Sequence, residues 1–276
     1  MKRLSLSIAA LGLLAATPSH ALFGLGINYG HNFADVKSEN STLSYGDLPS
    51  YLQGYAASFT DSTGYKTDSV LTLSRAKISG LQQIGVKAWI DIPFTDLSVD
   101  VGSNVAWGSY KSTVHYDDGV NKFNVDAGLN TGFPVWGIGK GETPYINLLN
   151  DLTLRYTFLK LPPLSPLQPL KISAGAGVTL VYGTRVVGKD DIKDIFDGSN
   201  VAGLTSEQIQ KKLSDKISDN LYTTTWGGHL DLNILLKVPV LPIAIYADGK
   251  WYIHTSVSDA ASKYPLALSA GLAFSL

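Results

Sequence analysis

Apolar and polar side chains alternate one by one along much of the chain after residue 22. In residues 23–33, for example, glycine residues separate the apolar side chains of Phe23, Leu25 and Ile27. Successive side chains of a β-strand point to opposite faces, so this period of two predicts strands that each have one apolar face. The segments that show it are 23–33, 84–92, 97–107, 123–133, 152–158, 170–182, 226–236, 243–253 and 266–276.

The connections between these segments are of two kinds. Proline cannot donate to a strand ladder, and it marks the connections near Pro93, Pro134, 162–169 and 239–242. The other connections are longer and more polar, and they are 37–77, 184–221 and 255–264. Short turns at one rim and long loops at the other are typical of transmembrane β-barrels.

The arrangement of the turns sets the expected number of strands. The proline turns all fall at one rim only if a further strand forms near 135–141, and the resulting even total agrees with bacterial barrels. We therefore expect an all-β, up-and-down antiparallel transmembrane β-barrel of about ten strands, within a range of about eight to twelve. Short helices are expected in the long extracellular loops: one after Asp47, with apolar residues up to Phe59, and one after the capping box of Thr205 and Gln208.

The same alternation would fit a water-soluble barrel with an apolar core, but two features favour lipid around the apolar faces. The opposite faces are rich in Gly, Ser, Asn and Thr, and charged residues make up only 16% of the chain. Aromatic residues lie toward the strand ends, as in the girdles of membrane barrels. Trp89 has the opposite parity, so we expect it to point inward. The girdle candidates are Tyr29, Phe33, Trp107, Phe133, Phe158, Tyr182, Trp226 and Trp251.

The N-terminus predicts export. Two basic residues, the apolar run 4–15 and small residues before Ala21 have the order of a secretory signal peptide. We expect cleavage after Ala21, so that 1–21 is the signal peptide and 22–276 is the barrel. The apolar run is shorter than the roughly 20 residues of a spanning helix. No later stretch is long and apolar enough for such a helix. If the mature chain spans a membrane, it must therefore do so as a closed barrel, because only helices and closed barrels satisfy all their backbone hydrogen bonds in lipid.

The last eight residues, Ser269 to Leu276, carry a further pattern. Ser269, Gly271, Phe274 and Leu276 occupy the polar, glycine and two apolar positions of a motif. This segment resembles the assembly signal on the final strand of bacterial outer-membrane β-barrel proteins, although these proteins more often end in Phe or Tyr. The resemblance implies a location in the bacterial outer membrane, with outer-membrane lipid and the barrel assembly machinery as partners. It carries over no active-site residue.

Charged and imidazole side chains are scattered along the faces that should point inward. Both signs occur in nearly equal number, so we expect them to pair across the lumen, whereas an ion-selective pore would have a wall of one sign. The lumen-facing candidates are Lys87, Asp91, Asp100, Asp126, Asp151, Arg155, Lys171, His229, Asp231, Lys237, Asp248, Lys250 and His254.

The sequence offers little catalytic chemistry. His229, Asp231 and His254 could form a catalytic or metal cluster, but contacts among lumen side chains are the favoured interpretation. No G-x-S-x-G elbow and no H-E-x-x-H motif occurs. We therefore expect no enzyme, no cofactor and no metal. The formal net charge of −1 argues against a nucleic-acid partner.

Two functions remain as equal expectations, a small passive porin-like channel and a structural or surface-interaction barrel that acts through its long loops. An enzyme that acts on lipid ranks behind both. Side chains fill the interior of narrow barrels, which favours a closed lumen. Inward glycines would leave space for an open one, and the candidates are Gly24, Gly26, Gly30, Gly175, Gly177 and Gly271.

Overall fold

A computed structural model defines the fold over most of the chain. It describes residues 23–43, 71–117, 122–126, 128, 137–161, 169–188, 207–208, 211–212, 215, 222–238 and 241–275. Within these ranges, no helix is both long and apolar enough to cross a membrane.

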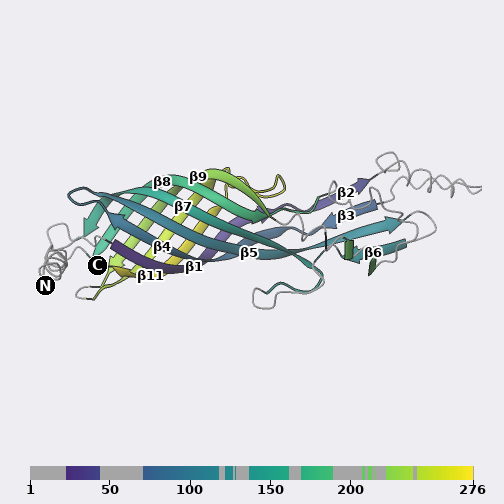
Figure 1. The fold of residues 1–276 in the computed structure, drawn as a ribbon, viewed down its shortest axis with the longest axis horizontal. Helices are drawn as coiled ribbons and strands as arrows, with labels where there is room; N and C mark the ends of the chain where they lie inside the picture. The colour runs from purple at the N-terminus through teal and green to yellow at the C-terminus, as the bar shows by residue number, and fades with distance from the viewer. Residues whose placement is uncertain are drawn as a thin grey trace, which may run out of the picture.

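Among the described residues, eight antiparallel strands close into an up-and-down barrel (Figure 1). Each strand pairs with the next barrel strand along the chain, and β11 pairs with β1 to complete the ring. The expectation of an all-β, up-and-down antiparallel barrel is therefore confirmed. The strands are β1 (Phe23–Val36), β4 (Ile78–Asp91), β5 (Leu97–Asp117), β7 (Glu142–Leu161), β8 (Leu170–Thr184), β9 (Tyr222–Lys237), β10 (Ile243–Ile253) and β11 (Leu266–Ser275).

A smaller sheet extends from one end of the barrel, and we call it the extension. In it β2 (Glu39–Leu43) pairs with β3 (Leu71–Arg75), β3 pairs with the distal part of β5, and β6 (Lys122–Asp126) also pairs with β5. β5 is 21 residues long and belongs to both sheets. Figure 1 shows the extension projecting away from the barrel end at which β1 begins and β11 finishes.

The barrel has eight strands, at the lower limit of the expected range. The alternating segment that begins at 123 contributes β6, which lies in the extension. No strand forms over 137–141, where Gly137 and Gly141 have φ of 70° and 78° in a turn. These φ values are incompatible with an extended strand. The connection from β5 to β7 therefore joins these strands at the same end as the other long connections, and among its described residues it contains β6 but no further barrel strand.

Three of the four proline connections join barrel strands at the end opposite the extension. They are 92–96, 162–169 and 238–242, and we call this end the turn end and the other the loop end. Pro134 and the first expected loop helix, after Asp47, lie outside the described residues. In the second expected helix, Glu207, Gln208, Lys211, Lys212 and Asp215 are helical, but its apolar stripe is outside the described residues. Helices in the loops therefore stay a prediction.

The barrel is apolar outside and polar inside. On β1, Ile27 is 63% exposed, whereas Asn28 and Asn32 on the inner face are 6% and 2% exposed. Large apolar side chains cover the outer face of the other barrel strands in the same way. Water-soluble proteins bury such side chains, so this surface is suited to lipid. Trp89 is buried on the inner face, as its parity predicts.

Several inward glycines make room for large side chains. A Cβ atom on Gly24 would lie 2.1 Å from the indole of Trp89. On Gly26 and Gly271 it would lie 2.7 and 2.5 Å from the ring of Tyr246. These distances are far below van der Waals contact, so each glycine forms a socket that an aromatic ring fills. The two opposing expectations for the lumen are thereby reconciled, because small and large residues interlock.

We predict that Gly26→Val destabilises the folded barrel by about 1–3 kcal/mol, the usual cost of overpacking. The new side chain would displace Tyr246 from its socket. Gly249→Val is the matched control, because it adds the same side chain to the outer face, where the nearest atom to an added Cβ is 3.4 Å away. Urea unfolding of both variants in detergent micelles, followed by tryptophan fluorescence, measures the difference. An equal loss in the two variants would contradict the socket role.

Candidate functional site

The middle of the lumen is crossed by a cluster of buried ion pairs centred on Arg155 of β7. Its guanidinium contacts Asp100 of β5, Asp231 of β9 and Asp248 of β10, the last at 3.1 Å between Nη2 and Oδ1. The side chains are at most 4% exposed. β5 and β10 lie on opposite sides of the ring. One cation therefore ties strands together across the whole lumen.

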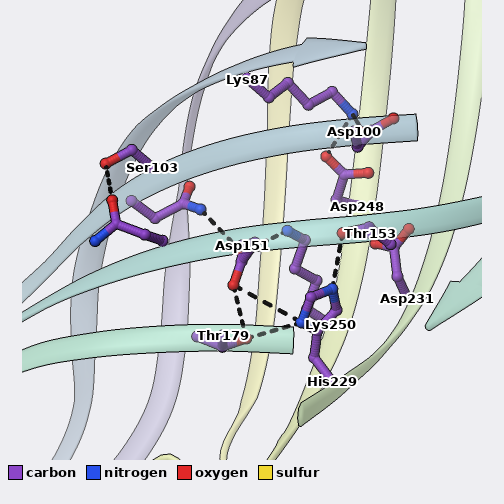
Figure 2. Close-up of polar contacts among 12 residues, drawn as sticks. Lys87, Asp100, Ser103, Asp151, Thr153, Thr179, His229, Asp231, Asp248 and Lys250 are labelled. Atoms are coloured by element: carbon purple, nitrogen blue, oxygen red, sulfur yellow. Dashed lines mark hydrogen bonds and ion pairs between the residues drawn. The ribbon is translucent and has the colours of Figure 1, made fainter. Parts of the chain in front are cut away.

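Lys87 of β4 adds a second cation to this cluster. Its Nζ lies 2.8 Å from Oδ2 of Asp248 and 4.0 Å from Oδ2 of Asp100. The same atom is 3.8 Å from the ring centroid of Tyr246, which adds a cation–π contact. Figure 2 shows Lys87, Asp100 and Asp248 converging from three strands. Because the lysine is buried, its charge depends on these partners for compensation.

Asp151 of β7 is the centre of a second polar cluster, nearer the loop end. Its carboxylate accepts hydrogen bonds from Lys250 at 2.6 Å, Thr179 at 2.8 Å and Tyr252 at 3.1 Å. Its side chain is completely buried. Figure 2 places Asp151 between Thr179, Lys250 and the imidazole of His229. The donors come from β8 and β10, so this cluster also joins strands across the lumen.

His229 is held on both ring nitrogens. Thr179 Oγ1 lies 2.8 Å from Nδ1, and Thr153 Oγ1 lies 2.8 Å from Nε2. Thr179 already donates its proton to Asp151, so it accepts from Nδ1–H, and Nε2 then accepts from Thr153. The neutral Nδ1–H tautomer satisfies this chain of hydrogen bonds. Neither nitrogen is left to bind a metal or a substrate.

The charges of the lumen balance. At the turn end, Lys171 Nζ lies 3.2 Å from Asp91 Oδ2. Among the expected lumen residues that the structure places on inner faces, acidic and basic side chains are equal in number, so this group has no net charge that would select ions of one sign. The acidic ones on inner faces are Asp91, Asp100, Asp151, Asp231 and Asp248, and the basic ones are Lys87, Arg155, Lys171, Lys237 and Lys250.

Two very small cavities lie between these polar groups in the described part of the barrel. One of about 10 Å³ is lined by Asn28, Gln83 and Asp100 among others. Another of about 20 Å³ lies beside Arg155 and Lys171. A cavity needs roughly 10–15 Å³ of space open to the centre of a water molecule to hold one such molecule. These two cavities are therefore about the size of a single water molecule.

Two segments fold into the barrel mouth at the loop end and close it. In 254–265, Ala261 forms a β-bridge with Val36, and Ala260 O accepts from Lys37 N at 2.9 Å. The segment 185–188 contributes Val186 to the same apolar plug. The buried residues of this plug are Ala34, Val36, Ile78, Leu81, Ala106, Tyr110, Tyr145, Leu149, Val181, Val186, Tyr252, Ala261 and Ala267.

Arg75, at the end of β3, fixes the extension to the mouth. It is 4% exposed. Its Nη1 donates to Val187 O at 2.6 Å and lies 2.7 Å from Glu39 Oε2, while Nε donates to Lys37 O at 3.2 Å. One side chain thus joins β2, β3 and a mouth segment. The base of the extension is therefore held in place by the hydrogen bonds and the ion pair of a buried side chain.

Glu142, at the start of β7, fastens the neighbouring loop. Its carboxylate accepts hydrogen bonds from Ser109 Oγ at 2.6 Å and from Gly139 N–H at 2.9 Å. These two hydrogen bonds stabilise the ionised form and lower the pKa of Glu142 below its ordinary value. The turn at 137–141 is therefore tied to the rim of the barrel.

The structure places most of the expected lumen residues inside the barrel. Asp126 and His254 are exceptions, and the prediction for these two is wrong. Asp126 is exposed in the extension, because β6 pairs beyond the rim. His254 has a φ of 56° that ends β10, and its exposed side chain lies beside Tyr264. The buried candidates are Lys87, Asp100, Asp151, Arg155, Lys171, His229, Asp231, Asp248 and Lys250, with Asp91 and Lys237 partly buried.

Sequence reasoning missed Arg75 and Tyr246. Arg75 lies in a long connection, and only the short alternation over 71–75 indicated a strand there. Tyr246 shares the inward parity of Asp248, and this signal could have identified it. Of the expected assembly signal, Ser269 and Gly271 lie partly buried on β11, Phe274 faces outward, and Leu276 is outside the described residues.

No family model matches the chain, and the search of curated proteins found no match. Similar solved structures include Ail, the attachment invasion locus protein of Yersinia pestis, at 8% identity over 92% of this chain and 99% of that one, with a TM-score of 0.37. The outer membrane protein OprG of Pseudomonas aeruginosa is 13% identical over 94% and 98%, with a TM-score of 0.35. The outer membrane protease OmpT of Escherichia coli is 10% identical over 92% and 96%, with a TM-score of 0.38. These are outer-membrane β-barrel proteins, the general class that the C-terminal strand resembles.

We predict that Arg155→Met destabilises the folded barrel by about 3–5 kcal/mol, the usual cost of breaking a buried ion pair. Three carboxylates would lose their shared cation, and Lys87 alone cannot neutralise them. The free energy of unfolding in urea, measured in detergent micelles, gives the size of the effect.

Lys160→Met is the control for this prediction. Its Nζ lies 2.5 Å from Asp96 Oδ1, but the Asp96 side chain is 46% exposed. An accessible pair of this kind contributes about 0–1 kcal/mol. If the two variants lost the same stability, the Arg155 cluster would not be the crosslink that we describe.

Proposed function

We propose that this protein is an integral outer-membrane barrel with a closed lumen, and that it serves as a rigid anchor for a surface-interaction module. The module is the extension, together with the long loops beside it. The polar interior and apolar exterior support a location in lipid. The signal peptide expected at 1–21 would supply export, and the C-terminal strand would supply recognition by the assembly machinery.

The observation that carries the proposal is a change of face within β5. From Leu97 to Trp107 its apolar side chains occupy odd positions and point outward. The buried side chains occupy even positions all along β5, and from Tyr110 onward the large apolar side chains occupy these even positions too, with Tyr110 and Val114 at 3% and 0% exposure. The same unbroken strand thus changes from a pattern suited to lipid to one suited to water. This change supports a membrane rim between Trp107 and Tyr110.

The extension has the faces of a water-soluble sheet. Leu73, Val114 and Val125 are buried on one side. The opposite side exposes short polar groups, among which His115 Nδ1 lies 2.6 Å from Asn124 Oδ1. Because β5 continues into it and Arg75 locks its base, the extension is held in a fixed orientation. A fixed polar surface outside the membrane is suited to contact with other molecules at the cell surface.

The alternative of a passive channel has less support. Ion pairs cross the lumen in the middle, and an apolar plug of side chains fills the mouth. The enzyme alternative is weaker still. The hydroxyls of Thr153 and Thr179 are bound to His229 in the closed interior, where no substrate could reach them.

We predict that the folded protein gives no steady ionic conductance in planar lipid bilayers, because its interior charges are paired and its mouth is filled. A porin of known conductance, reconstituted in parallel, controls for insertion. A gel run with and without boiling verifies that the reconstituted sample is folded. Steady conductance from the folded protein would contradict the closed anchor and revive the channel.

We predict that Arg75→Ala loosens the extension without unfolding the barrel. The loss of charge-assisted hydrogen bonds to Val187 and Lys37 should raise the open population about tenfold. Proteolysis follows that population when opening is fast, so cleavage in the extension should be about tenfold faster in vesicles. Lys77→Ala is the control, because its side chain is 56% exposed and lies 3.8 Å from Asp35. Equal cleavage rates in both variants would contradict the anchoring role.

A further inference from the structure

The belt formed by the outward side chains of the barrel strands contains one pair of polar side chains well inside it. From the turn end up to Tyr29, Ile84, Trp107 and Trp226, every other outward side chain of the eight described barrel strands is aromatic, aliphatic or glycine. The outward polar side chains His31, Gln82 and Thr224 lie beyond these residues, toward the loop end. Ser103 of β5 and Asn150 of β7 are the exceptions. Each lies between two buried inward residues of its strand, so both side chains face out. They are cross-strand neighbours in the β5–β7 ladder.

The two side chains form one hydrogen bond with each other, but this bond leaves the N–H donors of Asn150 without an acceptor. Ser103 Oγ donates to Asn150 Oδ1 at 2.9 Å, and the dashed line from Ser103 in Figure 2 marks this bond. The Asn150 amide nitrogen has two N–H donors. In the part of the chain that the structure describes, no hydrogen bond uses them. Asn150 therefore presents donors to its surroundings.

The pair lies well inside the belt. Ser103 is four residues from Trp107 and six from Leu97 along β5. At about 3.3 Å per residue and a tilt of about 40°, it lies roughly 10 Å below the upper aromatic girdle. Hydrocarbon at this depth offers neither water nor headgroup oxygen. An amide without a partner there is costly, and only another protein can supply an acceptor.

We propose that the β5–β7 face is a contact between two copies of this chain, with Asn150 at its centre. An asparagine amide is self-complementary, because it both donates and accepts. Two copies related by a twofold axis could exchange a pair of N–H···O hydrogen bonds through this one residue. The surrounding side chains are aliphatic, including Val101 and Leu152 at 57% and 50% exposure, and they would pack around the bonds. The proposal rests on the proposed membrane location.

Single cysteines test this contact without background, because the chain contains no cysteine. We expect Leu152→Cys, which leaves Asn150 in place, to form a disulfide-linked dimer on mild oxidation in native outer membranes, seen on a non-reducing gel. Ala270→Cys is the matched control, because it lies on the outer face of β11, on the opposite side of the ring. It should stay monomeric. A dimer at both positions would indicate random collision and overturn the proposal.

A second variant separates a contact between copies from a purely structural role. Leu152→Cys serves as the reporter, alone and combined with Asn150→Leu. We expect Asn150→Leu to weaken dimerisation about tenfold, as for the loss of interchain hydrogen bonds in lipid, while the monomer unfolds at the same or higher urea concentration. Loss of monomer stability with unchanged crosslinking would overturn the proposal.

The same samples distinguish the two levels of the argument. Membrane fractionation and the mobility shift on boiling report whether the chain is a folded membrane barrel. A folded barrel in the membrane fraction that forms no Leu152→Cys dimer would overturn the contact and leave the closed anchor intact. A soluble protein without a mobility shift would overturn the membrane location itself. Crosslinking only to a different membrane protein would overturn the second copy as the occupant.

Discussion

Closure of the hydrogen-bonded ring is the constraint on which the rest of the structure depends. β1 pairs with β11 over nine residue pairs, from Gly24–Ser275 to Asn32–Ala267, so the barrel has no open edge. In lipid, each unpaired backbone group would cost several kcal/mol. Closure with eight strands also fixes the circumference, and a ring of that size has an interior just wide enough for side chains. The first requirement on the inner face is therefore that its side chains pack together, and a pathway for solutes comes second.

The interior solves that problem with interlocking sizes and compensated charges. Glycine sockets receive Trp89 and Tyr246, and the space that remains holds side chains whose charges must pair because they are buried. Arg155 can serve three carboxylates at once because its guanidinium offers donors in several directions. The same narrow ring that makes closure possible thus makes a cross-lumen ion-pair cluster necessary.

The sequence predicted the barrel and its inverted faces, because both follow from local parity. It also predicted the inward direction of Trp89 and the group of lumen charges. The strand number did not follow, because β6 alternates like a barrel strand, and its pairing beyond the rim depends on the length of β5. The signal for that length was the change of apolar parity between Trp107 and Tyr110. The partners of Arg155 and His229 are set by register across the ring, which one strand's sequence does not contain.

The proposed closed interior directs function to the outer surfaces. The side chains that face inward are engaged in holding the ring, so a change there alters stability before it alters recognition. Side chains on the outer surfaces do not hold the ring together, so polar groups among them need another explanation. On the extension, polar groups meet water and are ordinary. On the lipid-facing belt, polar groups do not meet water. The polar side chain of Asn150 therefore indicates a protein contact, whereas the polar face of the extension alone does not. Burial and polarity are informative here only relative to the solvent that each surface meets.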